Sequence, residues 1–226
     1  MYPVRDLQFS VLDAHEVSAL LLVPPNATAL LVMAHGAGAG MNHSFMSAIS
    51  NELAAAGIAT LRYNFPYMQQ HRRVPDPPPV LTATVAAAVN VAAKSNPGLP
   101  LFAGGKSMGG RMTSQAAAGQ SLQGVKGLIF FGFPLHPPKR PSTKRADHLK
   151  QVSVPMLFLQ GTRDELADLS LLRPICGELG SQVTLHIIDG ADHSFHVLKR
   201  SGKTDAEVLA DLARTVKSWT KEHSAP

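Results

Sequence analysis

Ser107 is the residue whose surroundings first suggest chemistry. It lies in Gly105-Lys-Ser-Met-Gly109, which matches the G-x-S-x-G pattern of a serine on a tight strand-to-helix turn. Glycine on both sides lets the helix pack close to the strand, and the turn directs free N–H groups of the helix at the reacting atom. A glycine-rich loop that contains a serine by chance is the alternative. The pattern predicts a nucleophilic serine if the chain also supplies a base and an acid.

Asp164 is the expected acid. A serine hydroxyl is a weak nucleophile near neutral pH, so it needs a base, and that base needs a carboxylate to hold its tautomer. In the order serine, acid, histidine, the acid should follow a strand. The predicted strand that ends at Leu159 is followed by Gln160-Gly-Thr-Arg-Asp164. Gly161 permits a tight turn back toward the site, which favours Asp164 over the alternatives Glu165 and Asp168.

His193 is the expected base. It lies in Asp189-Gly-Ala-Asp-His193-Ser-Phe195, a loop rich in glycine and aspartate that follows the last predicted strand. The chain has 10 histidines, so a surface histidine is the alternative interpretation. His186 lies within a predicted strand and His196 comes after the loop, so neither has the required placement.

Two backbone amides are expected to bind the developing oxyanion. One is that of Met108, the residue after the serine, and the other is that of Ala37 in His35-Gly-Ala-Gly38, which follows an earlier strand. The same glycines could instead only permit close packing of a strand and a helix. The order of the loop in the chain favours the oxyanion role.

The apolar pattern of the sequence predicts the strands that must position these residues. Residues 7–12 and 16–23 are predicted to form an antiparallel pair at the N-terminus. Continuous apolar runs indicate strands that are covered on both faces. The further predicted strands are 29–34, 58–63, the segment from 99 to the Ser107 turn, 125–131, 154–159 and 183–188.

Helices are predicted between these strands, at residues 44–56, 81–94, 108–118, 144–151 and 169–179. A last helix begins with the capping box Thr204-Asp-Ala-Glu207. Residues 75–79, four of them proline, are interpreted as lacking regular structure. The alternation predicts an α/β fold: one domain over residues 1–226, with a mostly parallel sheet, helices on both faces and an antiparallel N-terminal strand pair.

Six segments resemble the α/β-hydrolase superfamily. They are His35-Gly-Ala-Gly-Ala-Gly-Met41, Arg62-Tyr-Asn-Phe-Pro-Tyr67, Gly104-Gly-Lys-Ser-Met-Gly-Gly-Arg111, Phe133-Pro-Leu-His-Pro137, Gly161-Thr-Arg-Asp164 and Gly190-Ala-Asp-His193. Within the superfamily the chain resembles small dienelactone-hydrolase-like members. It is most similar to a lidless group of predicted hydrolases, related to a testis-expressed protein and to a subunit of a nuclear histone-acetyltransferase complex. The resemblance implies the α/β-hydrolase fold without a full lid domain.

One departure limits this resemblance: dienelactone hydrolases have a cysteine where this chain has Ser107, which argues against that activity. Residues 133–154 are too few for a lid domain, although residues 134–148 could cover part of the site. Residues just past the strand ends are expected to line the substrate site. They are Asn42, His43, Asn64, Phe65, Tyr67, Phe133 and His136.

The charge of the chain does not indicate nucleic-acid binding. The net charge is +5, but the basic residues are spread out, and no arginine-rich helix or zinc-ligand spacing occurs. The pairs at 72–73, 139–140 and 144–145 are expected in solvated loops, with attraction of an anionic substrate as the alternative. Arg111 has the same two interpretations: a solvent or acid contact, or a position near an anionic substrate.

Membrane and secretion signals are also missing from the sequence. No apolar run approaches about 18 residues, and no signal peptide is evident. The single cysteine, Cys176, fits a reducing compartment and a packed side chain, so we expect a cytoplasmic protein. No metal or cofactor is implied.

These observations predict a serine hydrolase that cleaves a small carboxylic ester or thioester. Ser107 would attack, His193 would act as base and then acid, and Asp164 would orient it. An amidase or peptidase with the same residues is one alternative. A non-catalytic interaction module, suggested by the resemblance to a complex subunit, is the other.

Overall fold

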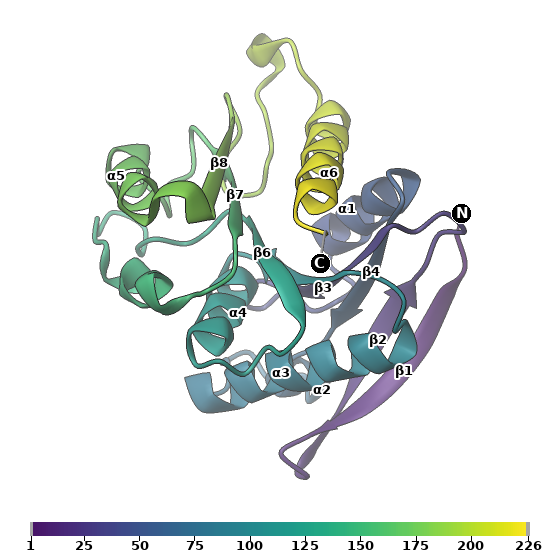
Figure 1. The fold of residues 1–226 in the computed structure, drawn as a ribbon. Helices are drawn as coiled ribbons and strands as arrows, with labels where there is room; N and C mark the ends of the chain where they lie inside the picture. Colours follow the sequence, from purple (N-terminus) through teal and green to yellow (C-terminus); the bar gives the residue numbers. More distant parts are fainter. Residues whose placement is uncertain (1, 225–226) are drawn as a thin grey trace.

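The sheet of this protein has eight strands in the order β1-β2-β4-β3-β5-β6-β7-β8. The computed structural model describes residues 2–224. The pairs β1/β2 and β2/β4 are antiparallel and the remaining neighbours are parallel (Figure 1). The strands are β1 (Val4–Val11), β2 (His15–Leu22), β3 (Ala29–Ala34), β4 (Ile58–Tyr63), β5 (Leu101–Lys106), β6 (Val125–Phe131), β7 (Met156–Gly161) and β8 (Val183–Ile188). The predicted mostly parallel sheet with an antiparallel N-terminal pair is confirmed.

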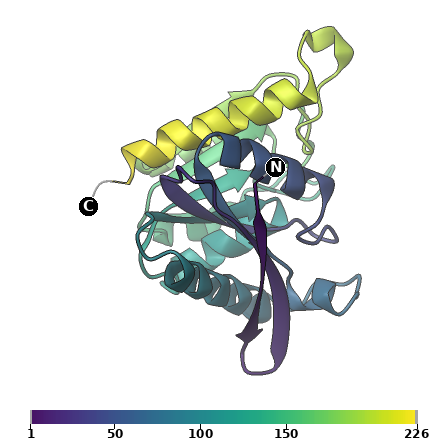
Figure 2. The ribbon, with the colours of Figure 1, turned by 90° about the vertical axis from the view of Figure 1, so that its right-hand side faces the viewer.

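Helices cover both faces of the sheet, as the sequence predicts. On one face lie α1 (Ser44–Ala55) and α6 (Asp205–Glu222), side by side in Figures 1 and 2. The other face carries α3 (Pro78–Ser95), α4 (Met108–Ala118) and α5 (Leu169–Leu179). Short helical segments complete the chain: α2 (Pro66–Gln69) and the 3₁₀ turns η1 (Lys144–Gln151), η2 (Gly180–Gln182) and η3 (Lys199–Ser201).

The central strands and the edge strand of the sheet differ in burial. Every residue of β3, β4 and β7 is buried, because helices pack on both faces of the central sheet. The edge strand β1 is largely exposed. The apolar runs therefore predicted the central strands well, since a strand covered on both faces has no polar positions to alternate.

Two local expectations need correction. Helix α3 begins at Pro78, inside the stretch expected to lack regular structure, and residues 66–69 form a short helix that the sequence did not predict. Each of these helices begins with proline, where the missing N–H has no helical partner and the fixed φ suits a helix. The capping box of α6 is confirmed: Thr204 and Glu207 each bond the backbone N–H of the other.

The order of the strands puts a topological switch point at the carboxyl ends of β3 and β5. After β3 the chain passes to α1 on one face, and after β5 it passes to α4 on the opposite face. Loops that diverge at such a switch point leave space between them for a ligand. The carboxyl ends of β6, β7 and β8 lie at the same edge of the sheet, because these strands are parallel to β5.

No helix within residues 2–224 combines the length and apolar character needed to cross a lipid bilayer.

Strand β5 can pass through the sheet centre only with glycine at its end. A Cβ atom on Gly104 would lie 1.9 Å from the carbonyl oxygen of Ile129 on β6. We expect Gly104→Ala to lower the free energy of unfolding by at least about 3 kcal/mol, because backbone would have to move. Urea unfolding followed by circular dichroism measures this loss.

Gly177→Ala is the matched control for Gly104→Ala. Gly177 lies on the exposed side of α5, and nothing comes within 4 Å of an added Cβ. This variant should gain roughly 0.5–1 kcal/mol from helix propensity. Equal urea midpoints for the two variants would contradict the close approach of β5 and β6.

Candidate active site

The backbone at Ser107 adopts a conformation that L-residues rarely take. Its φ is 52° and its ψ is −120°. Such a conformation costs on the order of 1–3 kcal/mol and persists where the surroundings impose it. The Ser107 N–H donates to Phe131 O at 3.2 Å, and its carbonyl accepts from Arg111 N–H at 3.1 Å. These bonds and the packing of the adjacent glycines hold the strained turn between β5 and α4.

Three predicted residues from different strand ends form one series of hydrogen bonds. The Nε2 atom of His193 lies 2.8 Å from Ser107 Oγ, and its Nδ1 lies 2.7 Å from Asp164 Oδ2. A carboxylate only accepts, so Nδ1 carries the hydrogen and Nε2 is free to accept the serine proton. This arrangement can deprotonate Ser107 during attack and stabilise the imidazolium that results.

Asp164 has the fixed environment that an orienting carboxylate needs. Its side chain is fully buried, and besides His193 it accepts bonds from Gln160 Nε2 and from Leu166 N–H. The other end of Gln160 accepts from the N–H of Phe133. Gln160 therefore ties the acid to the loop after β6, a role that the sequence analysis missed.

The two alternative acids lie elsewhere. Glu165 bonds no member of the series, and Asp168 caps α5 by accepting from Ser170 N–H. That cap holds the pKa of Asp168 below its usual value. Of the three acids, Asp164 is the one that contacts His193.

The loop that carries His193 is organised by its neighbour Asp192. The Asp192 Oδ1 atom accepts from the N–H groups of Ser194 and His196, at 2.8 and 3.0 Å. Two backbone bonds, Asp192 N–H to His196 O and Phe195 N–H to Asp192 O, close the turn. The other histidines near here are engaged: His196 bonds Asp205 and His186 bonds Asp211.

The loop after β3 lies directly against the serine. A Cβ on Gly36 would lie 3.6 Å from the Cβ of Ser107. Within residues 2–224, the N–H groups of Ala37 and Met108 donate no hydrogen bond to another protein group. Met108 opens α4, where free amides and the helix dipole favour negative charge. Both predicted amides thus remain available for an anion.

Side chains from the segment after β4 hold this loop in shape. Tyr67 Oη accepts from Gly38 N–H at 2.9 Å, and Asn64 Oδ1 accepts from Met41 N–H at 2.9 Å. The side chains of Phe65, Tyr67 and Phe133 have 0% exposure. These three were expected to line the substrate site. Because they are buried, they instead pack in the core below the site.

The remaining predicted lining residues differ in accessibility. Asn42 and His43 are exposed at the start of α1, and His43 Nδ1 accepts from Phe45 N–H. His136 is buried: its Nδ1–H donates to Pro137 O and its Nε2 accepts from Asp168 N–H. A position just past a strand end predicts nearness to the site, but it does not tell which way the side chain faces.

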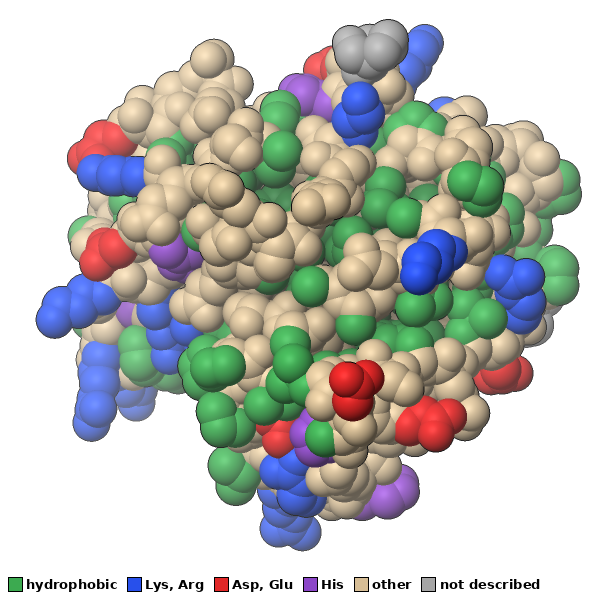
Figure 3. Space-filling view, turned by 60° about the horizontal axis from the view of Figure 1, so that its bottom comes forward, with side chains coloured by type: hydrophobic (Ala, Val, Ile, Leu, Met, Phe, Trp, Pro, Cys, Tyr) green, Lys and Arg blue, Asp and Glu red, His purple; other side chains and the backbone are tan. Residues whose placement is uncertain are grey.

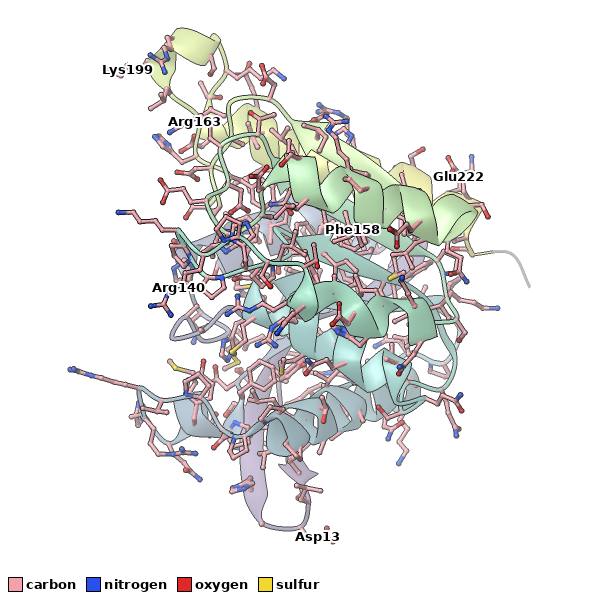
Figure 4. The ribbon with its side chains drawn as sticks, turned by 90° about the vertical axis from the view of Figure 1, so that its left-hand side faces the viewer. Asp13, Arg140, Phe158, Arg163, Lys199 and Glu222 are labelled. Carbon is pink, nitrogen blue, oxygen red and sulfur yellow. The ribbon has the colours of Figure 1, made fainter. Side chains whose placement is uncertain are left out.

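Two open cavities flank the acid–base pair. One of about 350 Å³ borders His193 and is lined by Pro138, Arg163, Glu165, Leu166, Asp192, His193 and Ser194. The other, of about 460 Å³, borders Asp164 and includes His136, Lys139 and Pro141. Part of the segment at residues 134–148, from His136 to Pro141, therefore lines these two cavities. Figure 4 shows Arg140 and Arg163 on one side of the molecule, opposite Glu222 of α6.

A comparison with family models decides the family. The model described as alpha/beta hydrolase domain matches residues 27–221. The chain belongs to the alpha/beta hydrolase domain family. The matched residues include every member of the hydrogen-bonded series. Within residues 2–224, this hydrolase has no group of three His, Cys, Asp or Glu side chains placed to hold a metal ion.

Solved structures share the fold of this alpha/beta hydrolase at low sequence identity. A dienelactone hydrolase from Anabaena variabilis is 19% identical, with a TM-score of 0.76 over 99% of both chains. A serine hydrolase homologue from Coxiella burnetii is 20% identical, with a TM-score of 0.75 over 94% of this chain and 97% of that one. A serine hydrolase without a lid from Xanthomonas campestris is 20% identical, with a TM-score of 0.73 over 97% of both.

His35 is a buried residue of this hydrolase that must stay neutral. Its Nδ1–H donates to Gly36 O at 2.7 Å, and its Nε2 accepts from Phe65 N–H at 3.1 Å. Burial lowers its pKa from 6.5 to about 4. Protonation would turn Nε2 into a second donor facing an N–H group, so it would break the contact that joins the loop after β3 to the loop after β4.

Acidification should therefore destabilise the hydrolase before its carboxylates titrate. A depressed pKa contributes stability above the unfolded-state value of 6.5, and this stability is lost as pH falls toward about 4. We expect the free energy of unfolding to fall by about 2 kcal/mol between pH 6.5 and about 5. Urea unfolding across this range measures it. His35→Gln, which keeps an acceptor for Phe65 and cannot titrate, should show a flatter profile; an unchanged slope would contradict the assignment.

Proposed function

We propose that this protein is a serine hydrolase that cleaves small carboxylic esters or thioesters through an acyl-enzyme on Ser107. The observation that carries the proposal is the bonded series from Ser107 Oγ to His193 Nε2 and from His193 Nδ1 to the buried carboxylate of Asp164. The strained backbone at Ser107 supports it, because strain of this kind concentrates at functional sites.

In the first half of the reaction, Ser107 Oγ forms a bond to the acyl carbon while its proton passes to His193 Nε2. The amides of Met108 and Ala37 hold the oxyanion, and each such donor is typically worth about 10²–10³-fold in rate. Collapse of the tetrahedral intermediate breaks the bond to the alcohol or thiol, which leaves with the proton from His193. Asp164 stabilises the imidazolium without taking its proton.

In the second half, His193 accepts a proton from water as that water attacks the acyl carbon. The bond to Ser107 Oγ then breaks, and the proton returns to the serine with release of the carboxylic acid. The open cavities beside His193 and Asp164 leave a path for water. An ester or thioester is favoured over an amide because its leaving group departs more readily. The structural neighbours named as esterases have the same fold.

We infer that the substrate carries a negative charge. Arg111 lies one helical turn after Ser107, and its buried Nε has no hydrogen-bond partner within residues 2–224. Burial, with the nearby charge of Arg145, lowers the pKa of Arg111. His148 is bonded to Ser114, and burial, with the nearby charge of Arg111, lowers the pKa of His148 as well. A substrate carboxylate would relieve this crowding of cations.

Further basic residues extend this positive region. Lys139, Arg140 and Lys144 are exposed on the segment after β6. Figure 3 shows Lys and Arg side chains gathered at the left of the view, the side that carries α5 in Figure 1. Such a field would raise the local concentration of an anionic ester. We place the protein in the cytoplasm, which its single, free and buried Cys176 supports.

A fluorophosphonate probe tests the proposed nucleophile. We expect covalent labelling of the wild-type protein, mapped to the peptide that contains Ser107, and none in Ser107→Ala. Asp164→Asn should slow ester hydrolysis by about 10⁴-fold, because the imidazole then takes the wrong tautomer. Asp168→Asn, which alters the cap of α5 and leaves the series intact, is the matched control and should retain most of the wild-type rate.

A panel of substrates completes that experiment. It pairs neutral and carboxylate-bearing esters with the matching thioesters and amides, all with the same small acyl group. Anionic esters should have the lowest KM, and amides the lowest kcat/KM. A protein that is folded, unlabelled and inactive on every member would refute the enzyme and favour an interaction module, for which a stable partner in a pull-down would then be sought.

A further inference from the structure

The side chain of Lys106, the residue before Ser107, bonds the backbone of His193. Lys106 precedes Ser107 at the end of β5, and its Nζ donates to the carbonyl oxygen of His193 at 2.6 Å. In the sheet, β5 and β8 are separated by β6 and β7, so this contact spans two intervening strands. Gly132, after β6, leaves room for it: a Cβ there would lie 3.2 Å from Nζ and 3.4 Å from the imidazole.

Two aromatic rings fix the position of the ammonium. Phe45 of α1 and Phe195 of the His193 loop stack with their centroids 5.7 Å apart and their planes 18° apart. The Lys106 Nζ lies 5.7 Å from the first centroid and 5.6 Å from the second. Cation–π attraction to both rings therefore holds the ammonium beside the loop of the base.

The contacts of the Lys106 ammonium are not those of a lysine that only stabilises the fold. Within residues 2–224 it belongs to no ion pair; the carboxylates that act on it, Asp164 and Asp192, do so from a distance. A lysine that only filled space would lose little by pointing to solvent. Here the ammonium is drawn inward, and its one hydrogen bond is to the backbone of the residue that must face Ser107.

We propose that Lys106 is a positioning residue for His193. By holding the His193 carbonyl, the ammonium sets the place of the imidazole and so the hydrogen bond from Ser107 Oγ to His193 Nε2. This inference rests on the proposed serine mechanism, and it adds a residue that does not touch the reacting atoms. The same contact joins the loop of the base to α1 through the two stacked rings.

This role predicts that the first chemical step slows at high pH. Burial lowers the pKa of Lys106 from 10.5 to about 8, although Asp164 and Asp192 act in the opposite direction. As pH rises through about 8, the ammonium therefore loses its charge. The charge-assisted hydrogen bond and the attraction to the rings both weaken, and the positioning of His193 weakens with them. The rate of the first chemical step should then fall to a lower plateau.

The test compares Lys106→Met with wild type in the rate of fluorophosphonate labelling from pH 6 to pH 10. We expect labelling and kcat to fall about 10- to 100-fold at pH 7, the cost of a misplaced base, with KM little changed. The decline above about pH 8 should be present in wild type and absent from Lys106→Met. Lys106→Arg, which keeps its charge, should retain more activity and show no decline in this range.

Lys126→Met is the matched control, because Lys126 is an exposed lysine on the adjacent strand β6. It should keep the wild-type rate and the decline above pH 8. If Lys106→Met does not fold by circular dichroism, Lys106→Arg decides: a decline above pH 8 in wild type that is lost in Lys106→Arg supports the role, and equal profiles of the two proteins overturn it. If wild type is labelled and Lys106→Met is labelled at the same rate, the role of Lys106 is overturned and the serine mechanism stands. If wild type is not labelled, both are overturned.

Discussion

The close approach of backbones around the Ser107 turn is the constraint on which the rest of the site depends. A Cβ on Gly104, Gly105 or Gly109 would lie between 1.9 and 2.3 Å from a backbone oxygen of a neighbouring strand. This packing brings α4 against the end of β3 and forces the serine into its strained conformation. It also places the first amides of α4 beside the loop after β3, so two elements on opposite sides of the sheet border one small space.

Much of this arrangement is readable from the sequence, because it depends on local pattern and chain order. Apolar runs predicted the buried strands, and the parallel sheet brings their carboxyl ends to one edge. Ser107, Asp164 and His193 each follow such an end, and the structure brings all three within hydrogen-bond distance. The capping box of α6 was predicted equally well, since both of its partners lie within four residues of the chain.

Features that depend on contacts distant in sequence were not readable. Phe65 was expected in the substrate site and lies in the core, because a strand end does not fix the direction of the next side chain. The bond from Phe133 N–H to Gln160 Oε1 joins residues 27 positions apart, and that from Lys106 Nζ to His193 O joins residues 87 positions apart, so both require loops whose paths are set by packing. Helix α3 begins among prolines because the first turn of a helix tolerates them, a local rule that the proline count obscured.

The central claim is that Ser107 carries the acyl group during turnover. The most direct measurement mixes the protein with p-nitrophenyl acetate, stops the reaction with acid at short times, and determines both released p-nitrophenol and the acetylated peptide by mass spectrometry. We expect a burst of p-nitrophenol close to the protein concentration, with acetyl on Ser107, and neither in Ser107→Ala. Turnover with no acetyl on Ser107, or an equal burst from Ser107→Ala, would contradict it.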